Sequence, residues 1–549
     1  MPELTGGQAL VRALVANGVD TIFALPGVQL DGFFNALHDE RERIRVITPR
    51  HELGAGYMAL GYALASGKVG TYAVVPGPGL LNTFAALATA WSSNARVLCI
   101  AGQIPAAFIG KGLGMLHEIP DQLAMTRQLT KWAERIDHPS EVPAKVAEAF
   151  RQLWTGRPRP VGLEMAMDRL MASGSVTPIP AAAHRLGPEP DSATIKAAAA
   201  MLGAARKPLI VVGGGALHAS EELRALAEAL EAPVSAHWMG RGALSDEHYL
   251  SVTDPLGRRL WPESDVVLSV GTRLVHQRRM WAGLAGQKVI QINLDPEDMA
   301  RIQEPDIAIE ADSRAALQSL LAELPRHNHK RPSRKDELLG LKLEMERMYE
   351  TRLGPQMAYL KAIRRALDPD GIFVDELTQV GYVSRFAYPV LRPGTYLMPS
   401  NQGTLGWGFA TALGVKVAQP RRQVLSINGD GGFLYTANEL ATAVQYGINV
   451  VAVVFNDRAY GNVKRMQIEN YGGRVIGSDL HNPDFVRFAE SFGAAGYRAE
   501  TPERLTEVLA EAFQQNGPVL IDAPVGAMPD PWEIMWGQNL DSVMRGEKK

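Results

Sequence analysis

The chain has 549 residues, which is too long for a single hydrophobic core, so two to four domains are expected. Apolar residues make up 46%, charged residues 21%, and the net charge is −3, as in ordinary globular proteins and without the basic stripe of a nucleic-acid binder. The apolar runs are strand-sized and the first residues lack a signal core, so we expect no membrane span and a cytoplasmic location. Cys99 is the only cysteine, which excludes disulfides within the chain, and its apolar surroundings favour a packing role.

Residues 1–175 read as alternating strands and helices. Apolar runs predict strands at residues 21–25, 46–48 and 72–75, and small and apolar residues predict a helix at 55–65. Repeated strand–helix units of this kind are typical of a parallel, doubly wound sheet.

A proline-rich stretch at residues 178–190 indicates a linker, and a second α/β segment follows it at residues 190–326. The strands of this segment are predicted at residues 209–212, 266–270 and 289–294. Residues 327–350 are charged and favour a helix, which we expect to be an exposed connector.

A third segment, residues 352–535, has the same alternating character. Its strands are predicted at residues 372–375, 424–427, 450–455 and 519–522. The predicted fold class is therefore α/β, with three doubly wound parallel-sheet domains.

The third segment carries the most informative pattern of the chain. Gly429-Asp430-Gly431-Gly432 follows one predicted strand, and Asn456-Asp457 follows the next. Parallel strands bring such turns to the same carboxyl edge of a sheet, where open α/β sheets bind ligands. Glycines let the backbone approach a diphosphate, and carboxylates are ligands that Mg²⁺ prefers. We interpret the pair as a magnesium–diphosphate anchor; the glycine turn alone could equally be a plain strand–helix connection.

Asp430 and Asp457 are 27 residues apart (457 − 430). This pattern resembles the motif of thiamine-diphosphate (ThDP) enzymes, in which Gly-Asp-Gly is followed by an Asn-Asn pair, with Asp457 here in place of the second Asn. The resemblance to the acetolactate synthase, benzoylformate decarboxylase and pyruvate oxidase group spans nearly the whole chain. It implies a pyrimidine-binding domain (1–175), a central domain (190–326) and a domain that binds diphosphate and Mg²⁺ (352–535).

The same resemblance implies which acid activates the cofactor. Arg50-His51-Glu52-Leu53-Gly54 resembles the family's glutamate motif, whose carboxylate bonds N1′ of the aminopyrimidine and so promotes loss of the thiazolium C2 proton. Taken alone, Glu52 could equally be an acid that stabilises the N-terminus of the following helix.

Further cofactor contacts are implied by this resemblance. Leu405 would support the bend of the cofactor, the Gly403 carbonyl would accept from its 4′-amine, and Ala459 would offer Mg²⁺ a backbone carbonyl. Ordinary core packing is the alternative for Leu405. The other positions implied to contact ThDP are Asn82, Val380, Gly381, Gly429, Gly431, Gly432, Tyr460 and Gly461.

Two residues bear on the substrate. His117 lies where acetolactate synthases carry an active-site Gln, and Gln29 lies in a loop that resembles the family's first loop. An imidazole can transfer a proton near neutral pH, but a lone His is as often structural. Val75 stands where some aryl-ketoacid decarboxylases have a catalytic His, so that mechanism is not supported.

We therefore expect a ThDP- and Mg²⁺-dependent enzyme that decarboxylates a 2-oxo acid and joins the product to an aldehyde or ketone acceptor. The alternatives are simple decarboxylation to an aldehyde and a C–C lyase or hydrolase reaction on an acyloin or diketone. A non-catalytic nucleotide-binding protein and a nicotinamide oxidoreductase are rivals from other classes. In this family the glutamate domain of one subunit faces the diphosphate domain of another, which implies a homodimer or homotetramer.

Gly213-Gly214-Gly215 follows a predicted strand of the middle segment and invites a nucleotide-binding interpretation. The stretch lacks the full spaced-glycine fingerprint and a clear acid about 20 residues further on. Some relatives bind FAD in this domain, so FAD is an alternative ligand that this sequence does not favour.

Overall fold

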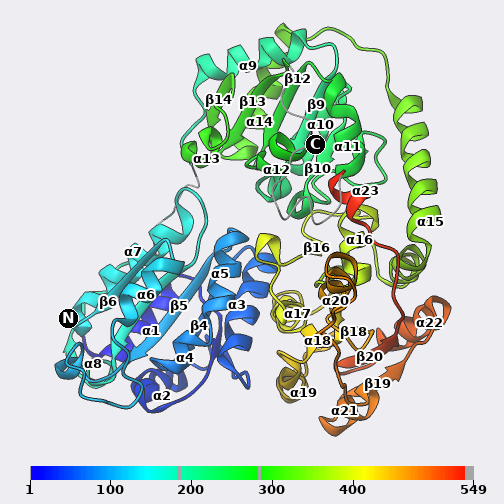
Figure 1. The fold of residues 1–549 in the computed structure, drawn as a ribbon. Coiled ribbons are helices and arrows are strands. Elements are labelled where there is room, and N and C mark those ends of the chain that lie inside the picture. Colours follow the sequence, from blue (N-terminus) through cyan, green and yellow to red (C-terminus); the bar gives the residue numbers. More distant parts are fainter. Residues whose placement is uncertain (1, 182, 184–186, 282–285, 538–549) are drawn as a thin grey trace.

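The computed structural model describes residues 2–181, 183, 187–281 and 286–537. Figure 1 shows three α/β units, each built on a six-stranded sheet in which all strand pairs are parallel. The predicted fold class is thereby confirmed. Among the helices of the described residues, none has the length and apolar character that crossing a membrane requires.

The first sheet has the strand order β3-β2-β4-β5-β7-β6. Its strands are β2 (Thr21–Ala24), β3 (Arg45–Ile47), β4 (Gly70–Val74), β5 (Val97–Gln103), β6 (Trp132–Ile136) and β7 (Val161–Ala166). Its helices are α1 (Gly6–Ala16), α2 (Asp31–Asp39), α3 (Glu52–Ser66), α4 (Pro78–Leu81), α5 (Phe84–Ser92), α6 (Gln122–Leu129), α7 (Val142–Trp154) and α8 (Met167–Met171). A short antiparallel pair, β1 (Glu3–Thr5) and β8 (Ser173–Ser175), flanks the unit.

The central sheet has the order β11-β10-β9-β12-β13-β14. Its strands are β9 (Pro208–Val212), β10 (Val234–Ala236), β11 (Ser251–Val252), β12 (Val266–Val270), β13 (Lys288–Asn293) and β14 (Ile307–Glu310). Its helices are α9 (Ser192–Ala204), α10 (Ser220–Leu230), α11 (Asp254–Leu260), α12 (Val275–Met280), α13 (Pro296–Ala300) and α14 (Ser313–Glu323). The strand order reverses between β9 and β12, so their carboxyl ends open the crevice typical of such sheets.

The third sheet has the order β16-β15-β17-β18-β20-β19. Its strands are β15 (Ile372–Val374), β16 (Tyr396–Leu397), β17 (Val424–Gly429), β18 (Val451–Asn456), β19 (Ala495–Arg498) and β20 (Val519–Pro524). Its helices are α16 (Gln379–Ala387), α17 (Trp407–Ala418), α18 (Asp430–Phe433), α19 (Leu440–Tyr446), α20 (Gly461–Asn470), α21 (Phe485–Ser491), α22 (Pro502–Ala512) and α23 (Trp532–Trp536).

The first and third units pack against each other through α3 and α17. Glycines make this close approach possible: a Cβ on Gly61 would overlap the carbonyl oxygen of Thr411, and a Cβ on Gly414 would overlap that of Met58. One apolar cluster therefore runs through both units, from Phe23 in the first sheet to Phe433 beside the third.

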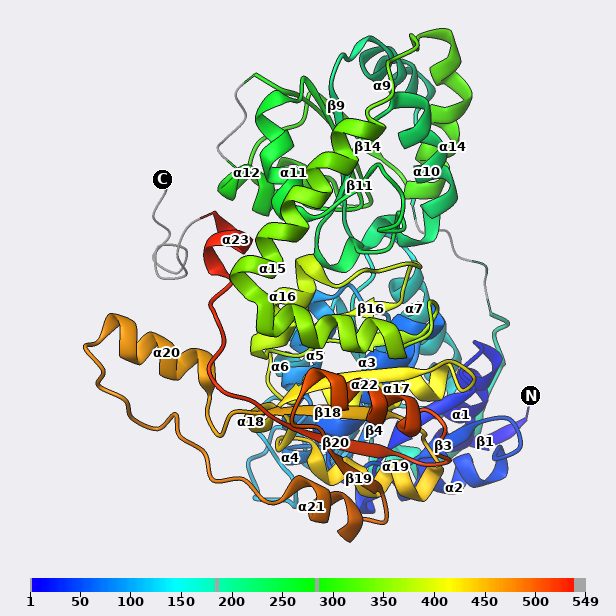
Figure 2. The ribbon, with the colours of Figure 1, turned by 90° about the vertical axis from the view of Figure 1, so that its right-hand side faces the viewer.

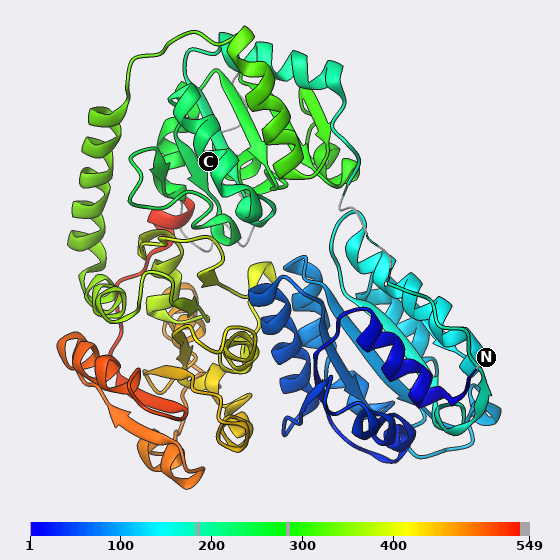
Figure 3. The same ribbon diagram turned by 180° about the vertical axis from the view of Figure 1, so that it is seen from behind.

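Helix α15 (Lys335–Ala366) connects the central and third units. It runs along one side of the molecule in Figure 3, where it is lime green. The helix bends at Leu353, whose φ of −129° and ψ of 28° are not helical, two residues before Pro355. Such a kink is the expected effect of a proline within a helix. The predicted connector at residues 327–350 thus forms the first half of a longer, bent helix.

Candidate active site

Loops at the carboxyl edge of the first sheet bring together four of the predicted residues. Gln29 follows β2, Glu52 begins the helix after β3, Asn82 follows β4 and its short helix α4, and His117 lies in the long loop after β5. Adjacent parallel strands end at the same edge, so residues far apart in the sequence gather there. We call this group the glutamate half-site.

Glu52 is the first residue of α3, three residues earlier than the predicted start of the helix. The helix begins there because the His51 side chain, at Nδ1, accepts the Leu53 N–H at 3.1 Å. His51 thus caps the helix, while Glu52 lies in its first turn, where a negative charge stabilises the N-terminus as the alternative interpretation expects. The Glu52 carboxylate accepts a hydrogen bond from the Asn82 amide at 3.0 Å and is only partly buried.

The turn before Glu52 is held by a residue of the third unit. The buried Glu439 carboxylate accepts the backbone N–H groups of Arg50, at 3.0 and 3.2 Å, and of His51, at 3.0 Å. Burial raises the pKa of Glu439, and the Thr442 hydroxyl also donates to it. Glu439 therefore holds the turn that leads into α3, although it lies far from this turn in the sequence.

Gln29 and His117 lie side by side in the glutamate half-site. The Gln29 amide donates to the Leu116 carbonyl at 3.2 Å, and a Cβ on Gly77 would overlap the His117 carbonyl oxygen. His117 has a φ of +70°, an uncommon conformation for a residue other than glycine. Its Nδ1 and the Gln29 Oε1 are buried and have no hydrogen-bond partner within the described part of the chain. Both polar atoms are therefore available to a bound group.

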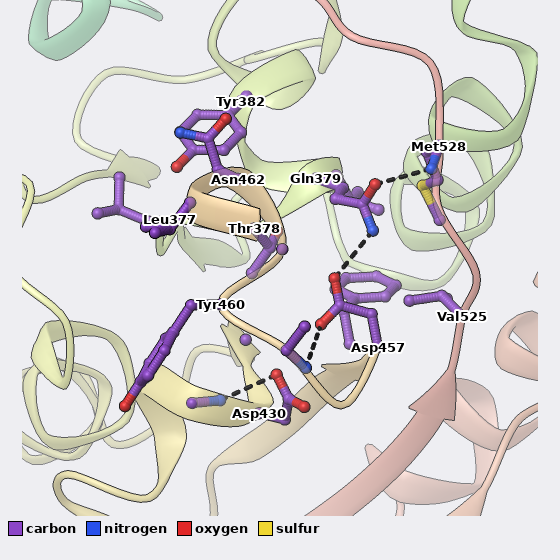
Figure 4. A pocket seen from close by; sticks show the side chains of 18 of the residues that line it. Leu377, Thr378, Gln379, Tyr382, Asp430, Asp457, Tyr460, Asn462, Val525 and Met528 are labelled. Atoms are coloured by element: carbon purple, nitrogen blue, oxygen red, sulfur yellow. Dashed lines mark hydrogen bonds between the residues drawn. The ribbon is translucent and has the colours of Figure 1, made fainter. Parts of the chain in front are cut away.

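A cavity of about 280 Å³ opens at the carboxyl edge of the third sheet. Figure 4 shows Asp430, after β17, and Asp457, after β18, on its floor, with Tyr460 at one side and Gln379 and Met528 at the other. The described residues that line this cavity all lie between Leu377 and Met528. We call it the diphosphate half-site.

The two aspartates place two carboxylates in one partly buried cavity, an arrangement that a bound cation would stabilise. Asp430 is buried, and its carboxylate accepts the Gly431 N–H at 2.9 Å and the Asn482 amide at 2.6 Å. Asp457 accepts the Ala459 N–H at 3.2 Å and the Gln379 amide at 3.1 Å. Burial, and then the negative charge of Asp430, raise the pKa of Asp457 to about 6. A divalent cation between two carboxylates offsets both effects, so these residues fit a magnesium ion.

Asn456 does not line the cavity, although it shares the Asn482 amide donor with Asp430. Its amide donates to Asp522 at 3.1 Å, and its carbonyl oxygen accepts from Asn482 at 3.0 Å. These bonds occupy the Asn456 side chain within the protein, whereas Asp457 lines the cavity. Of the Asn-Asp pair, the geometry thus favours Asp457 as the metal ligand.

Most of the other predicted cofactor contacts line the cavity, and three lie elsewhere. Leu405, Val380, Gly429, Gly431, Gly432, Ala459, Tyr460 and Gly461 line the cavity. Gly403, with a φ of +56°, lies in the turn before Leu405. Gly381 lies beneath the surface, where a Cβ would overlap the Glu376 carbonyl oxygen, so its requirement for glycine is structural. Asn82 belongs to the glutamate half-site.

Sequence reasoning missed Glu376, which follows β15 and is fully buried. Its carboxylate accepts the N–H groups of Gly406 at 2.9 Å and Gly408 at 3.2 Å, directly after Leu405. Burial raises its pKa to about 8. A Cβ on Gly432 would overlap Oε1 of this carboxylate. Glu376 thus joins the Leu405 turn to the glycine turn of Asp430. Two successive acids at the end of a buried strand, Asp375 and Glu376, were the available signal.

The glycines of the central unit are explained by loop packing. A Cβ on Gly213 would lie 2.6 Å from the carbonyl oxygen of Gly271, and one on Gly215 would lie 2.8 Å from the Gly271 Cα. The loops after β9 and β12 therefore touch only because both are glycine-rich. FAD in this unit stays an unfavoured alternative.

A histidine–carboxylate cluster also lies in the central unit. Asp254 is 3.1 Å from His237 Nδ1 and 3.3 Å from His276 Nε2, and the two imidazole rings stack with centroids 4.8 Å apart and an interplanar angle of 17°. A metal ion binds an imidazole nitrogen along its in-plane lone pair, so two stacked rings cannot share one ion. We therefore interpret the cluster as a hydrogen-bonded pair, His237 and Asp254, with His276 stacked beside it.

Comparisons with known proteins agree with this organisation. The chain matches the family models described as the thiamine pyrophosphate enzyme N-terminal TPP binding domain at residues 4–125, central domain at 195–320 and C-terminal TPP binding domain at 378–523. Thiamine pyrophosphate, or TPP, is another name for ThDP.

Several curated relatives match over nearly their whole length. A probable 2-ketoarginine decarboxylase of Pseudomonas aeruginosa is 35% identical over 94% of this chain and 94% of its own. A probable acetolactate synthase large subunit of Methanocaldococcus jannaschii is 34% identical over 96% and 93%, and the acetolactate synthase isozyme 3 large subunit of Escherichia coli is 30% identical over 96% and 95%. The chain therefore belongs to the family of thiamine-diphosphate-dependent enzymes.

Proposed function

We propose that the protein uses ThDP and Mg²⁺ to decarboxylate a 2-oxo acid and joins the resulting fragment to an aldehyde or ketone acceptor. The observation that carries the cofactor assignment is that Asp430 and Asp457 line one cavity beside a glycine turn, with the pKa of Asp457 raised to about 6. Relatives named acetolactate synthase support the second, bond-forming step.

Each half-site has a distinct part in this proposal. ThDP, when bound, supplies a carbon centre that attacks the 2-oxo acid and accepts the electron pair left by CO₂. Asp430, Asp457 and the Ala459 carbonyl would hold Mg²⁺ on the diphosphate. Glu52 would share a proton with the cofactor's pyrimidine. Gln29 and His117, each with an unpartnered buried atom, would face the substrate.

We further propose that the active site forms between two subunits. Apolar side chains lie exposed beside each half-site: Val28 and Leu116 at the first, Val463 and Ile468 of α20 at the second, each at least 50% exposed. In Figure 2, α20 stands away from the rest of the third unit, and it has no buried residue. Association would bury these side chains and bring Glu52 of one subunit to the diphosphate half-site of another.

Glu52→Gln tests the catalytic role. The variant should lose at least about 100-fold of CO₂ release from a panel of 2-oxo acids, as expected when a proton-sharing group is removed, yet keep the ThDP-dependent rise in melting temperature. Glu503→Gln is a matched control, because Glu503 also lies in the first turn of a helix, α22, but is remote from both half-sites. Full turnover by Glu52→Gln would contradict the proposal.

A simple decarboxylase is the second candidate function, favoured by the relative named 2-ketoarginine decarboxylase. Identification of the carbon product with and without added aldehydes separates the two. Ligation predicts a longer hydroxyketone or hydroxyacid product whose yield follows the acceptor concentration. Aldehyde release at the same rate as CO₂, unaffected by acceptors, would establish simple decarboxylation instead.

Mixing two inactive variants tests the shared active site. Mixed dimers of Glu52→Gln and Asp457→Ala subunits contain one intact site out of two, and random association makes half of the dimers mixed. Recovery of about a quarter of the wild-type activity is therefore expected after co-expression. No recovery, with mixed dimers demonstrated by two affinity tags, would place Glu52 and Asp457 in the same subunit's site.

A further inference from the structure

A second cavity, of about 400 Å³, lies away from both half-sites, where the central unit, the bent helix α15 and the end of α16 meet. Its walls come from three places in the chain: residues 241–256, residues 342–365 and residues 386–389. Cavities of this volume at domain borders are typical small-molecule sites. We call it the hinge cavity.

The floor of the hinge cavity is apolar and well ordered by packing. Leu256, Leu360, Phe386 and Tyr388 line it and are nearly inaccessible to solvent. The rings of Tyr349 and Phe386 pack with their centroids 5.1 Å apart. Such a floor suits the apolar body of an organic molecule.

The lining of the hinge cavity carries an excess of positive charge. Five cations, Arg241, Lys342, Lys361, Arg364 and Arg365, line the cavity with only two carboxylates, Asp246 and Glu346. Asp246 is already paired with Arg241 at 2.5 Å.

Among the described residues, three of these cations have no carboxylate partner. Lys342 donates to the Asp246 and His248 carbonyls, and Arg364 to the Tyr388 hydroxyl and to backbone carbonyls. Arg365 is exposed and has no partner among the described residues. The lining is therefore complementary to an anion.

One deeply buried donor is also left unused at this site. Arg241 is 2% exposed, and its Nη atoms are fully engaged with Asp246 and with the Arg385 and Tyr388 carbonyls. Its Nε has no hydrogen-bond partner in the parts of the chain that the structure describes. An unpaired guanidinium N–H at a buried position is costly unless a bound group satisfies it.

The position of the cavity gives such a ligand contact with two domains at once. The kink of α15 at Leu353 lies between two lining residues, Tyr349 and Met357. The helix before the kink packs on the central unit through Leu338, and the helix after it packs on the third unit through Leu360. A molecule in the hinge cavity would thus touch both arms of the bend.

We propose that the hinge cavity binds a small organic anion with an aromatic or branched apolar body and one carboxylate-like head group. The apolar floor takes the body, and Arg365 with its neighbouring cations takes the head group. Binding in the hinge cavity does not depend on the reaction proposed for the ThDP site.

The test uses full-length protein saturated with ThDP and Mg²⁺ and the fluorescent anion 8-anilinonaphthalene-1-sulfonate. The neutral dye N-phenyl-1-naphthylamine, which keeps the aromatic body without the sulfonate, is the matched probe. Arg365→Glu reverses a charge in the lining that has no partner among the described residues, Leu360→Trp fills the cavity, and Arg347→Glu reverses an exposed charge on α15 outside the cavity.

Wild-type protein should bind the anionic dye saturably at one site per chain. Arg365→Glu should weaken this binding about 5- to 10-fold, as reversal of one exposed charge allows, while the neutral dye is unaffected. Leu360→Trp should abolish it and Arg347→Glu should leave it unchanged. Equal binding of the anionic dye by wild type and Arg365→Glu would overturn the proposal, even if Leu360→Trp failed to fold.

Discussion

The aspartate at position 457 changes the charge balance of the diphosphate half-site. An Asn there would ligate a cation without adding charge, whereas Asp457 sits half-buried beside Asp430 and has its pKa raised from 3.8 to about 6. Between about pH 4 and 6 the folded, metal-free protein therefore retains a proton on Asp457 that the unfolded chain has released. The metal-free protein thus loses stability as the pH rises through this range.

This proton should compete with magnesium. Below pH 6 the dissociation constant for Mg²⁺ should rise about tenfold for each unit by which the pH falls, because each binding event must displace one proton.

Asp457→Ala should weaken ThDP binding strongly at pH 7, and Asn456→Ala much less. Calorimetric titrations between pH 5 and 7.5 measure both. A larger loss of ThDP affinity in Asn456→Ala than in Asp457→Ala would identify Asn456 as the metal ligand.

At single positions, sequence predicts those residues whose setting is local. Asp430 and Asp457 each follow a buried strand directly, and Glu52 follows β3 within a few residues; the structure places each at a carboxyl sheet edge. Glu376 and Glu439 could not be found in this way. Glu376 accepts a hydrogen bond from a backbone N–H 30 residues away in the sequence, and Glu439 accepts one from a backbone N–H 389 residues away. No local sequence pattern indicates contacts over such separations.

At the scale of elements, the α3–α17 contact shows how glycine sets a distance between helices. A helix pair without Cβ atoms at its crossing can approach more closely than ordinary side chains allow, and an added methyl group meets backbone that cannot move aside. Gly61 on α3 and Gly414 on α17 occupy such positions.

Gly414→Ala should therefore be destabilising although alanine favours helix formation. Overpacking of about 2 kcal/mol corresponds to a melting temperature lower by about 4–8 °C. Gly340→Ala, on the exposed side of α15 with nothing within 4 Å of its Cβ, is the matched control and should raise stability by about 0.5–1 kcal/mol. Calorimetry measures the melting temperatures of the two variants. A higher melting temperature in both would show that α3 and α17 can separate without cost.

Strand length alone did not decide which strands could be predicted: the three-residue β3 and β15 were predicted, whereas the six-residue β7 was not. β17 extends two residues beyond its predicted end because Asn428 and Gly429 still pair with Val454 and Phe455 of β18. Strands such as β16, with two residues, are too short to carry a periodic pattern. Likewise the connector predicted at residues 327–350 continues as α15 to Ala366, since Pro355 bends the helix rather than ending it.

For the whole molecule, the strand orders reveal a relationship hidden from sequence. In chain order, the strands of the first and third sheets are arranged 2-1-3-4-6-5, whereas those of the central sheet are arranged 3-2-1-4-5-6. The two half-sites therefore lie on units of the same topology. The predicted domain borders, 1–175, 190–326 and 352–535, stay predictions.

Helix α20 protrudes from the third unit, and a substitution on it tests the proposed association of subunits. Ile468→Asp should place a charge in the proposed subunit contact, shift the protein from oligomer to monomer at nanomolar concentration, and lower activity by at least about tenfold. Leu339→Asp, at another exposed apolar residue on α15, is the control. Sedimentation and activity measured on the same samples would contradict the proposed contact if Ile468→Asp remained oligomeric and active.

The packing of α3 on α17 also bears on the order in which the protein is made. Ten of the 15 residues of α3 are buried, yet Thr411, which covers Gly61, is synthesised 350 residues later (411 − 61). At about 5–20 residues per second, a ribosome needs roughly 20–70 s to bridge that gap. The nascent first unit must therefore expose the face of α3 that packs on α17 for most of translation, and a chaperone could cover this apolar surface in the meantime.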